Sequence, residues 1–105
     1  MKIKEVTDEY LLFDDGNIIT YYHCPDCCED NYAAFEEIDD IAWDYTFEKP
    51  LVFEKVEDCG FRFGNPGKMV FIPCYSKQNG YYSYVVDIYY SGGIGLDNVE
   101  CEIIY

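Results

Sequence analysis

The sequence His23-Cys24-Pro25-Asp26-Cys27-Cys28-Glu29 lies between a predicted strand and the only segment with a clear helical pattern, and the expected fold is organised around it. It contains the only histidine of the chain and three of its six cysteines. Nitrogen and sulfur donors at this density are typical of structural zinc sites, in which four Cys or His ligands form a tetrahedron. The stretch supplies at most three convenient ligands, so a fourth is expected from elsewhere, with Cys59 and Cys74 as the candidates.

Two other interpretations of these cysteines stay open. Cys24-Pro25-Asp26-Cys27 is a C-x-x-C sequence between a strand and a helix, which is where thioredoxin-type redox pairs lie. Against this, the chain lacks the alternating strands and helices of that fold, and acidic neighbours disfavour a thiolate. Free cysteines are also among the most buried residue types, so the thiols could be unligated core residues. We favour the metal site.

Upstream of the cysteine-rich stretch, the pattern predicts a meander of three short strands. The first two cover residues 2–6 and 9–13, and Asp14-Asp15-Gly16-Asn17 follows as a hairpin turn in which Gly16 adopts positive φ at little cost. The third strand, residues 17–22, is rich in β-branched and aromatic residues and leads to His23.

Downstream, the pattern predicts an amphipathic helix with Asp30 or Asn31 as its N-cap, and Glu48-Lys49-Pro50 ends it. Apolar residues recur at helical spacing and would form its buried face: Tyr32, Phe35, Ile38, Ile41, Ala42 and Tyr45. The opposite face is acidic, has no cation to relieve it, and consists of Glu36, Glu37, Asp39, Asp40 and Asp44. Like charges at i, i+4 cost a few tenths of a kcal/mol each, so this face destabilises its own helix.

The rest of the chain reads as strands separated by turn residues. We expect strands over residues 51–57, 61–63, 68–75, 81–90 and 99–105. Asn79-Gly80 predicts a hairpin between the third and fourth of these, and Pro73 places its strand at an edge or its end. The predicted fold is a single α+β domain over residues 1–105: a curled, mainly antiparallel sheet of about seven or eight short strands with one acidic helix packed on it.

Charge is distributed unevenly along the chain. From Glu5 to Glu48 there are 14 acidic residues and no lysine or arginine. Residues 1–48 therefore carry 12 net negative charges, whereas residues 49–105, with seven acidic and five basic side chains, carry two. Such a field repels nucleic acid and anionic membranes and attracts basic protein surfaces. Acidity also serves solubility, but an unbroken acidic half favours a basic protein partner.

No signal-peptide pattern precedes the first strand, and no apolar run approaches the roughly 20 residues that span a bilayer. We therefore expect a cytoplasmic protein without membrane association, in which the cysteines are reduced thiols or metal ligands.

Over nearly its whole length the chain resembles a small family of phage and prophage proteins. The shared pattern is His-x-x-Asp-Cys-Cys-Glu, which residues 23–29 match. Shorter shared segments follow later in the chain: Tyr32-Ala33, Gly60-Phe61-Arg62-Phe63-Gly64, Pro73-Cys74-Tyr75 and Asn79-Gly80-Tyr81-Tyr82. The resemblance implies that one structural zinc is held by His23, Cys27, Cys28 and Cys74. Cys24 and Cys59 fall outside the pattern, and either could replace one of the four.

Small acidic phage proteins of this kind are also similar to zinc-containing anti-CRISPR inhibitors of the type II RNA-guided nuclease, the CRISPR effector whose nucleic-acid channels are positively charged. The resemblance implies a non-enzymatic inhibitor that uses the acidic helix face to bind a basic surface of that nuclease. A zinc-dependent hydrolase or deaminase is one alternative, although the deaminase signature H-x-E…P-C-x-x-C is not met. A phage structural or assembly protein, with tyrosines as interface anchors, is another.

Overall fold

The computed structural model describes residues 1–23, 29–80 and 82–104, and in this part of the chain it contains ten strands and two short 3-10 helical turns. In chain order the elements are β1 (Ile3–Val6), β2 (Tyr10–Phe13), β3 (Ile18–Tyr22), β4 (Asp30–Ala33), η1 (Phe35–Glu37), η2 (Asp40–Asp44), β5 (Val52–Val56), β6 (Gly60–Asn65), β7 (Lys68–Lys77), β8 (Val85–Tyr90), β9 (Leu96–Glu100) and β10 (Glu102–Ile104).

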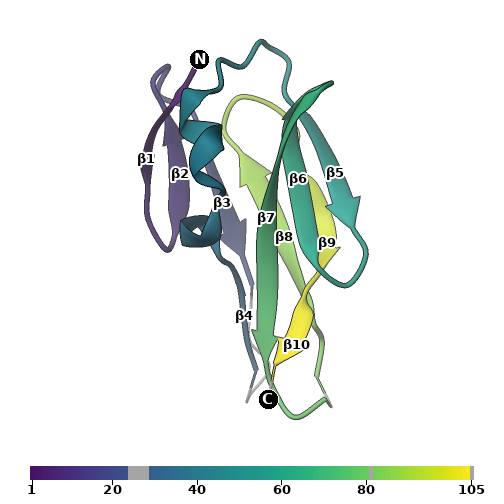
Figure 1. Cartoon of the computed structure of the whole chain (residues 1–105). Helices are drawn as coiled ribbons and strands as arrows, with labels where there is room; N and C mark the ends of the chain where they lie inside the picture. The colour runs from purple at the N-terminus through teal and green to yellow at the C-terminus, as the bar shows by residue number, and fades with distance from the viewer. Residues whose placement is uncertain (24–28, 81, 105) are drawn as a thin grey trace.

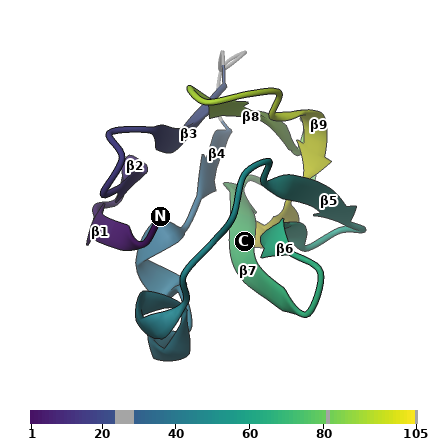
Figure 2. The same ribbon diagram turned by 90° about the horizontal axis from the view of Figure 1, so that it is seen from above.

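The strands form two curled sheets (Figure 1). The first has the order β1-β2-β3-β8-β9, and the second has the order β10-β7-β6-β5, with β4 added along β7. Neighbouring strands are antiparallel except β7 and β10, which are parallel. Seen from above, the sheets approach each other at β5 and β9, and η1 and η2 fill the opening between β1 and β7 (Figure 2).

Aromatic side chains fill the space between the sheets. The strands alternate buried and exposed residues, as in β2, where Leu11 and Phe13 are fully buried. Phe47, in the segment that follows η2, has its ring centroid 6.1 Å from that of Phe13 and 5.8 Å from that of Phe63. Since Phe13 belongs to the first sheet and Phe63 to the second, Phe47 joins the two sheets through one aromatic cluster.

The prediction of one amphipathic helix, and with it the α+β class, is wrong. Residues 30–33 are strand β4, and the acidic segment forms two separate 3-10 turns. Between the turns, Ile38 and Asp39 have extended backbone conformations, with ψ of 142° and 133°. The domain is therefore nearly all β, with two sheets in place of the single sheet that was expected.

Tertiary pairing explains why the start of the segment is a strand. Asn31, expected as a helix N-cap, is buried and pairs with Ser76 in the ladder between β4 and β7. Its side-chain Nδ2 donates hydrogen bonds to the carbonyls of Ser83 at 3.0 Å and Val85 at 3.2 Å. These bonds satisfy a buried amide, whereas a helix would have left the five acidic residues on one uncompensated face.

The turns at Gly16 and Gly80 lie where they were predicted, but the turn at Gly80 does not connect two paired strands. The meander β1-β2-β3 is confirmed, as is the turn at Gly16, where φ is +92°. Gly80 also has positive φ, at +95°, yet β7 and β8 lie in different sheets and do not form a hairpin. The edges of β7 near this turn are already occupied by β4 and β10, so the chain crosses to the first sheet.

Pro73 lies inside β7 and not at its end. Proline has no N–H to donate to a neighbouring strand. Pro73 lies just beyond the last residue of β7 that pairs with β4, so no hydrogen bond of that ladder is lost at this position. The predicted last strand is also divided: Cys101 separates β9 from β10, which join different sheets.

Across the described residues, no helix has the length and apolar character needed to cross a membrane.

Candidate functional site

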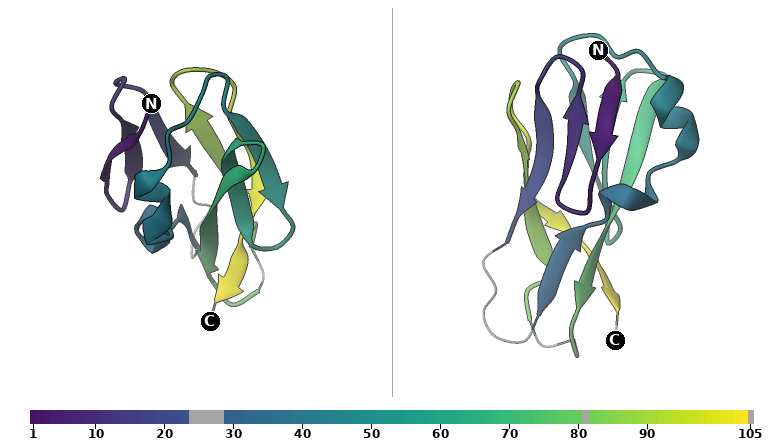
Figure 3. Two further views of the ribbon diagram at one scale, coloured as in Figure 1. Left: turned by 45° about the horizontal axis from the view of Figure 1, so that its top comes forward. Right: turned by 90° about the vertical axis from the view of Figure 1, so that its left-hand side faces the viewer.

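A groove lies between the two 3-10 turns and β7. β4 pairs with β7 only from Cys74 to Lys77, and the Ala34 N–H then donates a 2.8 Å hydrogen bond to the Pro73 carbonyl. Beyond this point the chain leaves β7 and forms η1 and η2, which stand beside the first half of β7 (Figure 3, right). The space left between them has a volume of about 450 Å³.

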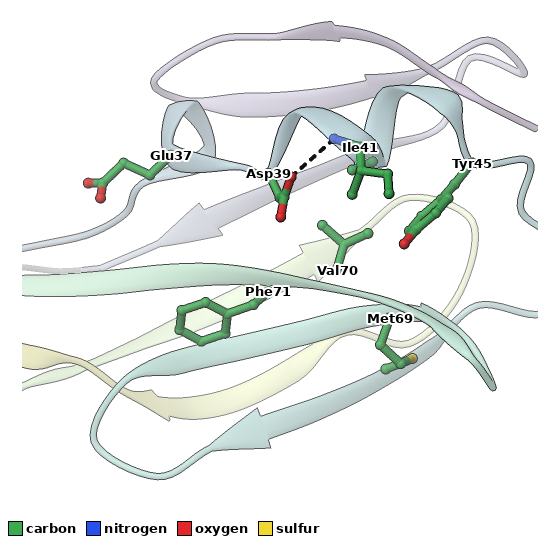
Figure 4. Close-up of a pocket in the computed structure, with 8 residues that line it drawn as sticks. Glu37, Asp39, Ile41, Tyr45, Met69, Val70 and Phe71 are labelled. Atoms are coloured by element: carbon green, nitrogen blue, oxygen red, sulfur yellow. Dashed lines mark hydrogen bonds between the residues drawn. The ribbon is translucent and has the colours of Figure 1, made fainter.

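The groove combines carboxylates with apolar side chains (Figure 4). Its lining residues are Glu37, Asp39, Ile41, Ala42 and Tyr45 from the turns and Met69, Val70 and Phe71 from β7. No basic side chain is among these described residues. We call this space the acidic groove.

The five acidic residues predicted to bind a partner are all exposed. Only Glu37 and Asp39 line the acidic groove. Glu36, Asp40 and Asp44 lie on the same two turns, outside the lining. The structure thus keeps the predicted residues on one segment, although they do not form one helical face.

Two of the carboxylates have structural hydrogen bonds. Asp39 is the N-cap of η2, because its Oδ1 accepts a hydrogen bond of 3.1 Å from the backbone N–H of Ile41. Glu37 Oε1 accepts a 2.9 Å hydrogen bond from the hydroxyl of Tyr75. This bond is the main reason why the pKa of Tyr75 is raised to about 12, with desolvation and the negative charges of Glu37 and Glu102 adding to it. Like any tyrosine, Tyr75 is neutral at physiological pH, and its hydroxyl joins η1 to β7 through this hydrogen bond.

Sequence reasoning missed the apolar part of the groove. Ile41 was assigned to the buried face of a helix, but it is 53% exposed, and Phe71 on the opposite wall is 41% exposed. In β7, Val70 and Ile72 are buried and Phe71 between them is not, so the two-residue period of a strand was the signal that could have identified Phe71. For Ile41 no such signal exists, because its exposure depends on the break at Ile38 and Asp39.

A second cleft, of about 620 Å³, lies away from the acidic residues. It is lined by Lys49, Pro50, Leu51, Tyr90, Gly92, Gly93 and Ile94. Ile94 is 92% exposed, and the Lys49 ammonium lies 3.2 Å from Asp15 Oδ2. This cleft brings together none of the residues predicted as functional, so we treat the acidic groove as the candidate site.

The proposed zinc ligands fall partly outside the described residues. Cys27 and Cys28 lie there, as does the alternative Cys24, and so the ligand set stays a prediction. Of the described donors, His23 lies at the end of β3, and its Nε2 is 3.2 Å from Glu29 Oε1. The side chains of these two residues are only 12% and 1% exposed. Among residues 1–23, 29–80 and 82–104, no three His, Cys, Asp or Glu side chains gather as a metal site.

The fourth predicted ligand, Cys74, lies in the core. It pairs with Ala33, three residues along β4 from Asp30, which corresponds to roughly 10 Å along the strand. Its thiol hydrogen-bonds to that of Cys101, and this contact together with burial raises the pKa of Cys74. A zinc ion bound by Cys74 would have to displace both this contact and the thiol proton.

The alternative fourth ligand, Cys59, is exposed in the turn between β5 and β6, where its carbonyl accepts a 2.9 Å hydrogen bond from the backbone N–H of Cys74.

Comparison with known proteins finds no match to this chain among protein family models, curated proteins or solved structures.

Proposed function

We propose that this protein is a non-enzymatic inhibitor that binds a basic surface of a nucleic-acid-binding protein. One observation supports this most directly: five exposed carboxylates lie between residues 36 and 44, on two short turns, in the half of the chain that has no lysine or arginine from Glu5 to Glu48. A field of one sign speeds the encounter with an oppositely charged surface and repels nucleic acid itself.

The partner we propose is a type II RNA-guided nuclease, met in the cytoplasm of a phage-infected host cell. The resemblance of residues 23–29 and of the later shared segments to phage proteins motivates this choice. The channels of such a nuclease are positively charged and would attract the negatively charged segment that contains η1 and η2. A structural zinc held by His23 and the neighbouring cysteines would stabilise the chain just before β4, which positions η1 and η2.

Titration of the protein into a cleavage reaction tests this function. We expect inhibition that saturates near equimolar protein and nuclease, with no turnover. A mobility-shift assay then separates two routes: occupation of a nucleic-acid channel abolishes DNA binding, whereas a block of the conformational step before cleavage leaves DNA binding intact. Undiminished cleavage by several type II nucleases at excess protein would overturn the proposal.

A further inference from the structure

The first half of β7 has one edge that no strand covers in the described part of the chain. β6 pairs with Lys68–Pro73 along one edge, and β10 continues that edge at Tyr75–Lys77. β4 pairs with the opposite edge, but only from Cys74 to Lys77. The segment Lys68–Ile72 is therefore open on the side that faces the acidic groove.

The backbone groups at this open edge can be identified from the register. In an antiparallel strand, the N–H and C=O of one residue point to the same edge, and successive residues alternate between edges. The Pro73 carbonyl points to the β4 edge, since it accepts from Ala34, whereas the Cys74 N–H points to the other edge, since it donates to the Cys59 carbonyl. By this alternation, the N–H and C=O of Phe71 and Met69 point into the groove.

We propose that the acidic groove binds an extended, basic peptide segment of a partner protein, which adds to β7 as a further strand. An open edge beside a lined groove is the arrangement used in strand addition, where backbone hydrogen bonds provide affinity and side-chain contacts provide specificity. The five residues Lys68–Ile72 span roughly 17 Å at the rise of a strand, enough for a segment of about five residues.

The walls of the groove define the side chains that such a segment should carry. Glu37 and Asp39 lie toward the β4 end and favour lysine or arginine there. Ile41 and Tyr45 lie farther along the same wall, with Met69 of β7 opposite them, so this end favours an aliphatic or aromatic side chain. The exposed Phe71 lies nearer the two carboxylates and offers an apolar surface to the stem of a lysine or arginine. In a strand, side chains two positions apart point to the same face. The segment that fits best therefore has a basic residue toward the β4 end and an apolar residue two positions farther along.

Charge decides between a partner segment and a second copy of this chain. Edge-to-edge pairing of two copies would bring the Glu37 and Asp39 carboxylates of both chains together, in a protein with a formal charge of −14. Inward-facing charges beside an open edge are a known protection against self-pairing. A basic segment meets no such repulsion.

The inference rests on the proposed function for its basic partner, but backbone pairing can be tested with peptides alone. The probe is a short synthetic peptide in which a lysine and a leucine stand two positions apart, so that both face the same wall, together with a version N-methylated on the residues that would pair with β7. We expect the first peptide to bind by calorimetry and to slow hydrogen exchange at the amides of Met69 and Phe71. Blocking the backbone hydrogen bonds should weaken binding about tenfold or more.

Two protein variants complete the test. Asp39→Asn keeps an oxygen that can cap η2 but removes a charge, so it should weaken peptide binding and leave stability unchanged. Ile94→Ser removes the most exposed apolar side chain outside the groove and should bind as the parent protein does.

Equal affinity of the N-methylated peptide, or binding without protection of Met69 and Phe71, would overturn strand addition. Protection of those amides that grows with protein concentration in the absence of peptide would show a second copy at the edge instead. Peptide binding with no nuclease inhibition would overturn the proposed function alone, whereas nuclease inhibition with neither peptide binding nor amide protection would overturn this inference alone.

Discussion

The hydroxyl of Tyr75 donates a 2.9 Å hydrogen bond to Oε1 of Glu37 and so joins η1 to β7 at the β4 end of the acidic groove. Just beyond this bond β4 ends, the chain turns away from β7, and the open edge begins. The bond therefore sets how far the acidic segment stands from the strand edge that it faces.

The first prediction concerns the titration of Tyr75. Its pKa is raised from 10.0 to about 12, chiefly by the hydrogen bond to Glu37. The unfolded chain loses this proton near pH 10 and the folded chain near pH 12, so the stabilising contribution is complete below pH 10 and is lost as pH rises through this window. Glu37→Gln should lower the pKa of Tyr75, measured by NMR titration of ring-labelled tyrosine. Glu36→Gln, next to it on η1, is the control and should not; equal shifts in both variants would contradict the assignment.

The second prediction concerns the acidic segment. The double variant Asp40→Lys/Asp44→Lys should reduce the association rate with the nuclease by roughly tenfold or more at low salt, because these carboxylates are exposed and lie outside the groove contacts. The matched control, Glu57→Lys/Asp97→Lys, has the same charge change on the opposite side of the molecule, beside β5 and on β9 (Figure 2).

Association rates with the nuclease should be measured by surface plasmon resonance at several salt concentrations. For the parent protein, the rate should fall as salt rises, since exposed charges are screened. Loss of rate in both double variants alike would mean that net charge, and not the acidic segment, attracts the partner.

The third prediction concerns zinc. We expect native mass spectrometry to find one zinc per chain, removable by chelator, and Cys27→Ser to lower the melting temperature sharply. Structural zinc contributes directly to folding, apparently ~10–16 kcal/mol in zinc-finger peptides. Cys59→Ser separates the two candidates for the fourth ligand: zinc is retained if Cys74 is the ligand and lost if Cys59 is. A metal-free protein that melts identically with and without chelator would remove the site altogether.

The fourth prediction concerns thiol reactivity. Cys59 is exposed, whereas Cys74 and Cys101 are buried and the pKa of Cys74 is raised by its contact with Cys101. Because the thiolate is the reactive form, alkylation of Cys74 and Cys101 should be slower than that of Cys59 by about a hundredfold or more, since it requires unfolding. Peptide mapping by mass spectrometry after timed iodoacetamide treatment measures the rates, with denatured protein as reference. Labelling of Cys74 at the rate of Cys59 would contradict its place in the core.

The fifth prediction concerns Phe47, whose ring joins the two sheets after the acidic segment. Phe47→Ala should lower the free energy of unfolding by ~3–5 kcal/mol, the usual cost of removing a buried phenylalanine ring. Trp43→Ala removes a larger ring that is 38% exposed and should cost distinctly less. Urea unfolding of both variants gives the comparison, and equal losses would mean that Phe47 is not central to the core.

Local signals were sufficient for the meander and for the position of most turns. The turn at Gly16 and the Pro66-Gly67 turn between β6 and β7 depend on residues within the turn itself, where glycine adopts positive φ without strain. The uneven charge and the concentration of acids between residues 36 and 44 were also visible directly, since they do not depend on folding. For the same reason, the identity of Glu37 and Asp39 as candidate residues needed no structure.

The tertiary structure alone decided what residues 30–45 become. Their apolar spacing fits a helix, but β7, more than forty positions away, offers Asn31 a ladder partner in Ser76 and thereby makes β4 a strand. It also decided that β7 and β8 do not form a hairpin at Gly80, since the edges of β7 near the turn are already taken by β4 and β10. Strand pairing between distant segments depends on which edges other strands leave open, and no local pattern contains that information. The acidic groove is the direct consequence, because it exists only where β4 stops short of the full length of β7.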